Sequence, residues 1–155
     1  MQHQHDNPGV IAPPPLIYGT GLLTGTVVNV LLPLPFVTGD WRPVIGFVLI
    51  AVGLILGFWA LRVMHRHQTS PLPERPTTAI VSDGPFRISR NPIYLGFTCI
   101  TLGCALWLNA LWVLLVLVPV LFVVQYGVIR REERYLEGKF GGQYLEYKAR
   151  VRRWL

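Results

Sequence analysis

Residues 84–96 read Gly-Pro-Phe-Arg-Ile-Ser-Arg-Asn-Pro-Ile-Tyr-Leu-Gly and bring together side chains that could bind a small charged molecule. Arg90 carries a guanidinium, which binds a carboxylate through two parallel hydrogen bonds. Asn91 adds an amide and Tyr94 a phenol, and both groups can donate and accept hydrogen bonds. Prolines fix the backbone of this segment and glycines leave it room. The pattern predicts a loop that enters a helix and lines a polar pocket.

A second polar segment, residues 130–136, places Glu132 and Glu133 side by side among three arginines. Neighbouring residues on a helix point about 100° apart, so the two carboxylates cannot face the same side. One could receive a cationic group while the other pairs with an arginine. A mixed run of charges is usually a solvated helix face. That interpretation weakens because residues 84–96 lie at the other end of the same apolar stretch.

Half of the first segment also has a purely structural explanation. Pro92 suits the first position of a helix, and Asn91 before it suits the N-cap. This explanation leaves out Arg90, Tyr94 and Gly96, which together offer a donor fork, a ring with a hydroxyl and a place for close backbone approach.

The composition indicates a membrane protein. Hydrophobic residues make up 52% of the chain and charged residues only 14%, against about 25% in soluble domains. The apolar residues lie in long runs without charge, at residues 16–37, 43–61 and 93–129. The last run is too long for one span of about 20 residues and fits two. A soluble bundle of four core helices is the alternative, but these segments are apolar on every face rather than along one stripe.

The sequence therefore predicts an all-α, polytopic membrane protein with a single domain over residues 1–155. Four transmembrane helices are expected at residues 16–37, 43–64, 93–109 and 110–129. Three other segments are expected, namely a flexible tail at residues 1–15, a cytoplasmic loop at 68–92 and a cytoplasmic helical carboxyl-terminal segment at 130–155.

The last two spans are predicted to form a hairpin. Asn109 lies near the middle of the third apolar run and is flanked by Trp107 and Trp112. Tryptophan favours the membrane interface, which fits the tip of a hairpin. This turn would return residues 130–136 to the side of the membrane where residues 84–96 lie.

The positive charges set the expected orientation. The net charge is +6, and most of the fourteen Lys and Arg residues fall between residues 62 and 90 or between 130 and 153. Positive loops stay on the cytoplasmic side. We therefore expect loop 62–92 and the carboxyl terminus in the cytoplasm, with the chain in a bacterial inner membrane. Contact with anionic headgroups explains the charge, and no groove-reading motif predicts nucleic-acid binding.

The order of these motifs resembles the membrane-embedded methyltransferases that include isoprenylcysteine carboxyl methyltransferase and the phospholipid N-methyltransferases. That family shows a Gly-Pro-aromatic start, an Arg-His-Pro-x-Tyr-x-Gly motif, a hydrophobic hairpin, a Glu-Glu pair and an aromatic tail. The matching residues here are Gly84-Pro85-Phe86, Arg90 to Gly96, Glu132-Glu133, Phe140-Gly141, Tyr144 and Tyr147, and the ending Val151 to Trp154. The resemblance covers roughly residues 79–155.

The resemblance implies S-adenosylmethionine as the methyl donor and a lipophilic acceptor that enters from the bilayer. By this likeness, Arg90, Asn91 and Tyr94 would serve catalysis. The cofactor would contact nine residues, namely Gly84, Arg90, Asn91, Pro92, Tyr94, Leu95, Gly96, Glu132 and Glu133. Methyl transfer is an in-line displacement, so holding donor and acceptor in line would supply much of the rate.

Asn91 stands where the family has histidine. An amide does not exchange protons near neutral pH. A carboxylate acceptor needs no base, whereas an amine must lose a proton, so the substitution favours methylation of a carboxyl group. Phospholipid amine methylation remains an alternative, as does a non-enzymatic four-span protein that retains the fold.

Metal binding is not expected. His3 and His5 could hold an ion, but a disordered tail is the better interpretation of the amino terminus. The sequence does not identify the acceptor or the oligomeric state.

Overall fold

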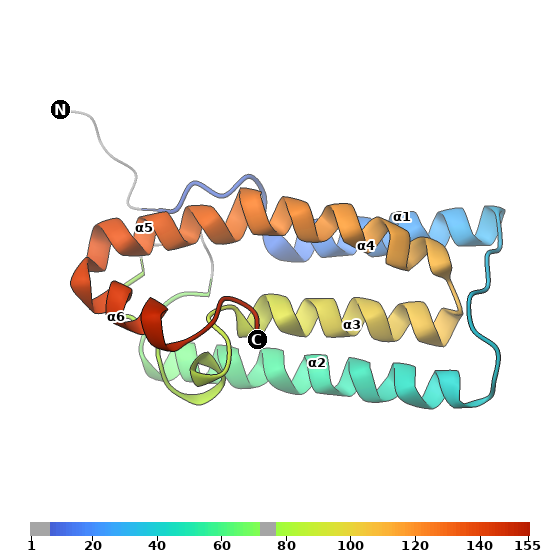
Figure 1. Ribbon diagram of the computed structural model, residues 1–155, viewed down its shortest axis with the longest axis horizontal. Helices are drawn as coiled ribbons and strands as arrows, with labels where there is room; N and C mark the ends of the chain where they lie inside the picture. The colour runs from blue at the N-terminus through green and yellow to red at the C-terminus, as the bar shows by residue number, and fades with distance from the viewer. Residues whose placement is uncertain (1–6, 72–76) are drawn as a thin grey trace.

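The computed structural model describes residues 7–71 and 77–155, and the regular structure of these residues is entirely helical. Four helices run alternately up and down as a bundle (Figure 1), namely α1 (Pro14–Leu31), α2 (Trp41–Arg66), α3 (Pro92–Leu108) and α4 (Leu111–Val124). The remaining elements are η1 (Gly84–Arg87), η2 (Gln125–Ile129), α5 (Arg130–Phe140) and α6 (Gly142–Arg150). The predicted all-α class is confirmed.

The amino-terminal residues before α1 are held against the bundle where the structure describes them. The Ile11 amide donates to the Gly127 carbonyl at 3.3 Å, and the Arg131 guanidinium donates to the Gly9 carbonyl at 2.7 Å. The described part of the tail thus has fixed partners. The possible metal ligands His3 and His5 lie outside the described residues.

Prolines set both ends of α1. The helix begins at Pro14, two residues earlier than predicted, because proline is tolerated in a first turn whose N–H groups lack partners. It ends at Leu31, and the prediction that it continues to residue 37 is wrong. Pro33 and Pro35 cannot donate the hydrogen bonds that would extend it.

The predicted hairpin turn is present. Helix α3 ends at Leu108 and α4 begins at Leu111, with Asn109 in the left-handed conformation at φ 51°. The Asn109 side-chain oxygen accepts the backbone N–H groups of Phe36 and Val37, both at 3.2 Å. One asparagine therefore closes the hairpin and fastens the loop between α1 and α2 to its tip.

Helix α4 passes through the π turn η2 into α5 without a break, giving one helix over Leu111–Phe140. The apolar part ends at Ile129, and α5 carries the charges. Gly141 then turns the chain at φ 54° and separates α5 from α6. The carboxyl-terminal segment, which the sequence left as one helix or two, is two.

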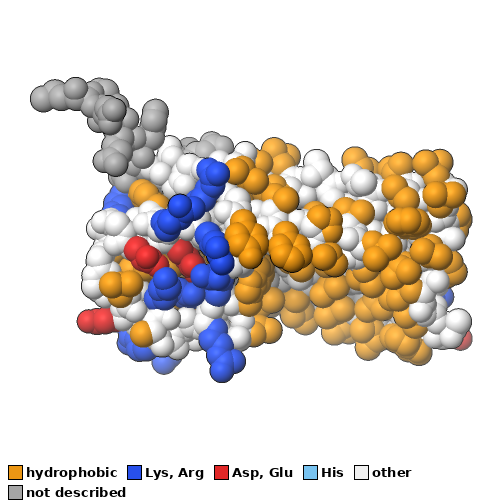
Figure 2. All heavy atoms as spheres, turned by 45° about the horizontal axis from the view of Figure 1, so that its top comes forward, with side chains coloured by type: hydrophobic (Ala, Val, Ile, Leu, Met, Phe, Trp, Pro, Cys, Tyr) orange, Lys and Arg blue, Asp and Glu red, His pale blue; other side chains and the backbone are white. Residues whose placement is uncertain are grey.

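Two helices are long and apolar enough to cross a bilayer, namely α2 and the continuous helix Leu111–Phe140, whereas α3 is apolar but shorter at 17 residues. Many large side chains of α2 face outward, with Phe47, Ile55 and Phe58 57%, 66% and 70% exposed. Apolar residues cover most of the bundle's length, and charged residues gather at one end (Figure 2). Apolar surface of this extent indicates a lipid environment.

Glycines let the bundle helices approach closely. A Cβ atom on Gly53 would lie 2.5 Å from the Gly96 carbonyl oxygen, and one on Gly46 would lie 2.8 Å from that of Gly103. These contacts join α2 to α3 along their lengths. Gly25 of α1 lies equally close to the α4 backbone. Small residues at such crossings bring backbones into van der Waals contact, which stabilises helix pairs in lipid.

Candidate active site

The two polar segments meet at the end of the bundle where α3 begins and α5 lies, and they enclose a cavity of about 130 Å³. Six of the residues predicted for the site line this cavity, namely Arg90, Asn91, Pro92, Tyr94, Glu132 and Glu133. The rest of the lining is largely apolar and includes Phe86, Ile93 and Leu136. The hairpin α3–α4 thus brings segments distant in sequence to one small enclosure.

Tyr94 links α3 directly to α5. Its hydroxyl donates to Oε1 of Glu132 at 2.7 Å, and the tyrosine is 8% exposed. Behind it, the Tyr18 hydroxyl of α1 donates to the Tyr94 carbonyl at 3.2 Å and lies 2.9 Å from the Thr98 hydroxyl. Helix α1 therefore supports the turn of α3 that carries Tyr94.

The carboxyl group of Glu132 lies on α5, beyond the apolar part of the long helix. Burial raises the pKa of Glu132 from 4.5 to about 7. The hydrogen bond from Tyr94 acts in the opposite direction, and the neighbouring charge of Glu133 raises the pKa further. Glu132 can therefore gain or lose a proton near neutral pH, as a general acid or base must.

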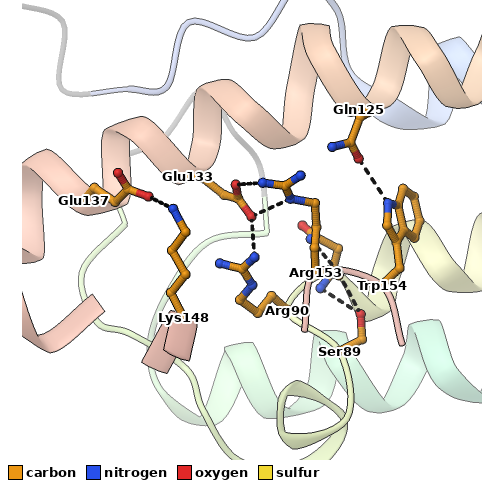
Figure 3. Close-up of polar contacts among 9 residues, drawn as sticks. Ser89, Arg90, Gln125, Glu133, Glu137, Lys148, Arg153 and Trp154 are labelled. Carbon is orange, nitrogen blue, oxygen red and sulfur yellow. Dashed lines mark hydrogen bonds and ion pairs between the residues drawn. The ribbon is translucent and has the colours of Figure 1, made fainter. Parts of the chain in front are cut away.

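Glu133 binds two guanidinium groups (Figure 3). Nη2 of Arg90 lies 3.0 Å from its Oε1 atom. Arg153, from the carboxyl-terminal segment, donates through Nε to Oε1 at 2.9 Å and through Nη2 to Oε2 at 2.6 Å. The Arg90 and Glu133 side chains are each only 8% exposed, so this cluster holds one negative and two positive charges largely out of water.

Arg90 keeps two donors without a partner. Its Nε and Nη1 atoms are buried and have no hydrogen bond among the residues that the structure describes. An unsatisfied buried donor is costly, and a charged one more so. An anionic ligand group in the adjoining cavity would satisfy one of these atoms, since Nε and Nη1 point to opposite edges of the guanidinium plane.

Asn91 occupies the N-cap position of α3 and Pro92 follows it in the first turn, as predicted, but the Asn91 side chain makes no capping hydrogen bond. Its Nδ2 atom instead donates to the Arg153 carbonyl at 2.9 Å. The Ser89 hydroxyl accepts the backbone N–H of Asn91 at 3.1 Å. Asn91 thus ties the start of α3 to the carboxyl terminus.

A family model described as phospholipid methyltransferase matches residues 41–143, which take in the loop, the hairpin and α5. The chain belongs to the phospholipid methyltransferase family. An uncharacterized protein of Haemophilus influenzae is similar as well, 48% identical over 64 residues, which are 41% of this chain and 100% of that protein. Membership supports a membrane-associated enzyme that transfers methyl groups to a lipid substrate.

Three of the predicted site residues, Gly84, Leu95 and Gly96, do not line the cavity of this phospholipid methyltransferase family member. A Cβ atom on Gly96 would lie 2.8 Å from the Gly53 carbonyl oxygen, so this glycine serves the packing of α3 on α2. Gly84 has φ 56° and packs beside Val63 of α2. The packing of Gly96 and the backbone conformation of Gly84 therefore explain why glycine stands at both positions without any ligand.

Arg153 was not predicted as a site residue. It nevertheless binds Glu133, although it lies beyond residue 143, where the match to the family model ends. Tyr144 and Tyr147 of α6 were noted only as aromatic tail residues, yet both line the cavity and are 2% and 5% exposed. The Tyr147 hydroxyl donates to the Phe86 carbonyl at 2.8 Å and so fastens α6 to η1. Burial raises the pKa of Tyr144 to about 12, so it stays a neutral phenol at physiological pH.

Proposed function

We propose that this member of the phospholipid methyltransferase family transfers a methyl group from S-adenosylmethionine to an acceptor carried by a lipid. One observation supports the proposal above all others. The cavity is lined both by Arg90, which has unpaired guanidinium donors, and by the carboxyl group of Glu132. A zwitterionic ligand needs donors and an acceptor placed in this way.

The residues present fit the cofactor. S-adenosylmethionine supplies an electrophilic methyl group on a sulfonium and also carries an amino-acid head and ribose hydroxyls. Arg90 would bind the carboxylate of the head through one of its unpaired donors, Nε or Nη1. Glu132, held by Tyr94, would accept the ammonium or a ribose hydroxyl. Gly84, Leu95 and Gly96 stay part of the proposed binding segment through the backbone that they shape.

In the membrane, we place four spans over α1 to α4 and the cavity end at the cytoplasmic surface. Helix α3, at 17 residues, rises about 25 Å, a little less than a full hydrocarbon core. Its polar start would then lie at the headgroup level, where water-borne cofactor and lipid meet. The arginines at this end fit a cytoplasmic orientation, in agreement with the distribution of charge in the sequence.

An apolar groove of about 440 Å³ supports a lipophilic acceptor. It is formed by Thr98, Leu121, Phe122, Gln125, Tyr126 and Trp154. Thr98 lies one helical turn from Tyr94, and its hydroxyl donates to the Tyr94 carbonyl at 2.9 Å. The groove therefore begins close to the cavity and would let a hydrocarbon chain lie beside the reacting centre.

The chemistry of Asn91 favours a carboxylate acceptor. Its amide cannot take a proton, and its Nδ2 atom is already committed to the Arg153 carbonyl. A carboxylate acceptor is deprotonated at neutral pH and nucleophilic without help.

Methylation of a lipid amine is a second candidate function, and Glu132 is the residue that supports it. A carboxylate with a pKa of about 7 can remove a proton from an ammonium before methyl transfer. Glu132 lines the cavity, so the proton would be taken up beside the bound ligand.

The test uses the full chain in nanodiscs of bacterial lipid. Calorimetry measures cofactor binding, and incubation with methyl-labelled cofactor shows whether label enters the lipid. Label released by mild base identifies a carboxyl ester, whereas base-stable label on a headgroup identifies N-methylation. Folded protein that neither binds cofactor nor transfers label would overturn the proposal and favour a non-enzymatic protein that retains the fold.

A further inference from the structure

The carboxyl-terminal segment reaches back into the candidate site and shares a carboxylate with Arg90. Arg153 makes two hydrogen bonds to Glu133, one to each oxygen, at 2.9 and 2.6 Å. Arg90 reaches the same carboxylate only through Nη2, at 3.0 Å. Figure 3 shows both guanidinium groups pointing toward the Glu133 carboxylate, Arg153 from beside it and Arg90 from below.

Other hydrogen bonds fasten this segment to the residues around the start of α3 and to η2. They are Arg90 N to the Arg152 carbonyl (3.0 Å), Ser89 Oγ to the Arg153 carbonyl (3.2 Å), Asn91 Nδ2 to the same carbonyl (2.9 Å) and Trp154 Nε1 to Gln125 Oε1 (3.0 Å). The position of Arg153 is thus fixed by its own backbone and by the tryptophan after it.

We propose that Arg153 is a positioning residue for ligand binding: by occupying both oxygens of Glu133, it prevents Arg90 from pairing with that carboxylate in bidentate fashion. Arg90 then keeps both Nε and Nη1 unpaired, and one of them can donate to an anionic group in the cavity. The proposal rests on the proposed function, because it identifies that group as the carboxylate of the cofactor's amino-acid head.

The argument follows from the geometry of guanidinium–carboxylate pairs. A lone arginine beside a buried carboxylate takes the two-bond arrangement, which for Arg90 would add Nε or Nη1 to Nη2 and so use a donor that a ligand would need. Here the two-bond arrangement belongs to Arg153, and Arg90 makes one contact. The Nε and Nη1 atoms of Arg90 remain buried without partners, as this division of the carboxylate requires.

Calorimetry on the full chain in nanodiscs tests this with two probes. Arg153→Ala should weaken S-adenosylmethionine binding about tenfold, the size of one charge-assisted hydrogen bond. Decarboxylated S-adenosylmethionine lacks the group that Arg90 would bind, so its affinity should be the same for wild type and variant. The S-adenosylmethionine affinity of Arg153→Lys should lie between those of the wild type and Arg153→Ala, because an ammonium cannot bind both carboxylate oxygens in a planar fork.

Two further variants make the test specific. Arg150→Ala removes an equal charge from an exposed residue of α6 and should leave both affinities unchanged. In an Arg90→Ala background, Arg153→Ala should have no added effect, since residues that act through one another are not additive. The positioning role would be overturned if Arg153→Ala weakened the binding of both probes equally. It would also be overturned if Arg153→Ala weakened binding further in the Arg90→Ala background.

A readout without cofactor separates this proposal from the proposed function. In the unliganded protein labelled with ¹⁵N-arginine, the Arg90 Nε–H signal is assigned by its loss in Arg90→Lys. Arg153→Ala should shift that signal downfield as Arg90 takes up the free Glu133 oxygen, and Arg150→Ala should not. An unmoved signal overturns the proposal, even if the wild type binds cofactor. A shifted signal supports it, even if cofactor binding fails. If Arg153→Ala does not fold, Arg153→Lys takes its place in every comparison.

Discussion

Tyr94 on α3 donates a 2.7 Å hydrogen bond to Glu132 on α5 and so joins the two polar segments across the cavity. The tyrosine is buried, and its backbone is supported by Tyr18 from α1. Residues of α1, α3 and α5 therefore together fix the position of the Glu132 carboxyl group. Because this carboxyl titrates near neutrality, its hydrogen bond governs both the geometry and the charge of the site.

Tyr94→Phe tests this control. Loss of the hydroxyl removes a hydrogen bond that stabilises the ionised form of Glu132, so the pKa of Glu132 should rise further. We expect cofactor affinity at pH 7 to fall about tenfold, measured by calorimetry. Tyr126→Phe, at a half-exposed position of η2, is the matched control and should bind normally. Normal binding by Tyr94→Phe as well would show that this hydrogen bond does not matter for the ligand.

Cofactor affinity should depend on pH through Glu132. In the free protein its pKa is about 7, and a cationic ligand group would lower that pKa in the complex. Binding should therefore strengthen as pH rises from about 5.5, by at most about tenfold per unit, and level off above pH 7. Glu132→Gln should bind more weakly with no such slope. A slope that persists in Glu132→Gln would assign the titration to another group.

The approach of α2 to α3 should tolerate no added side chain at Gly96. A Cβ atom there meets the Gly53 carbonyl oxygen at 2.8 Å, so Gly96→Val should destabilise the bundle by about 1–3 kcal/mol. Thermal unfolding in detergent measures this. Gly57→Ala is the control on the same interface, because its Cβ would meet nothing within 4 Å. Equal melting temperatures for Gly96→Val and wild type would contradict the packing.

The amide of Asn91 should be required as a donor. Asn91→Asp keeps the shape but turns the Nδ2 donor into an oxygen that faces the Arg153 carbonyl. The loss should cost about 1–3 kcal/mol in stability. Asn91→His keeps a ring donor and should be milder. Thermal unfolding of both variants measures which is less stable. If Asn91→Asp were more stable than Asn91→His, the hydrogen bond to the Arg153 carbonyl would be unimportant for stability.

Gly127 should hold the amino-terminal segment in place. Its carbonyl accepts the Ile11 amide, and a Cβ atom on it would overlap the Ile11 side chain. Gly127→Ala should release residues 7–13 while the bundle stays folded, seen as faster hydrogen exchange there by mass spectrometry. Gly138→Ala on the same helix has open space around its Cβ and should show no change. Unchanged exchange in Gly127→Ala would mean that Ile11 simply moves aside.

Much of the fold could be predicted because hydrophobic run length and proline position act locally. Uninterrupted apolar residues require helices in lipid, where backbone groups must bond within the segment. Asn109 between two tryptophans marked the hairpin tip, and Pro92 marked the start of α3. The meeting of Tyr94 with Glu132 follows from that hairpin, since two antiparallel helices of similar length return the chain to its starting level.

The sequence by itself determined which segments form apolar helices and that the two polar segments meet at one end of the hairpin. Only the tertiary structure decided which partner each polar atom takes. In the folded protein, Glu133 pairs with both Arg153 and Arg90, and the Asn91 side chain donates to the Arg153 carbonyl. Gly96 packs against α2 and does not line the cavity. These choices depend on where the carboxyl-terminal segment folds back, and that is set by contacts such as Trp154 with Gln125. Contacts between residues so far apart leave no periodic trace in sequence, because side-chain direction is fixed by packing and not by spacing.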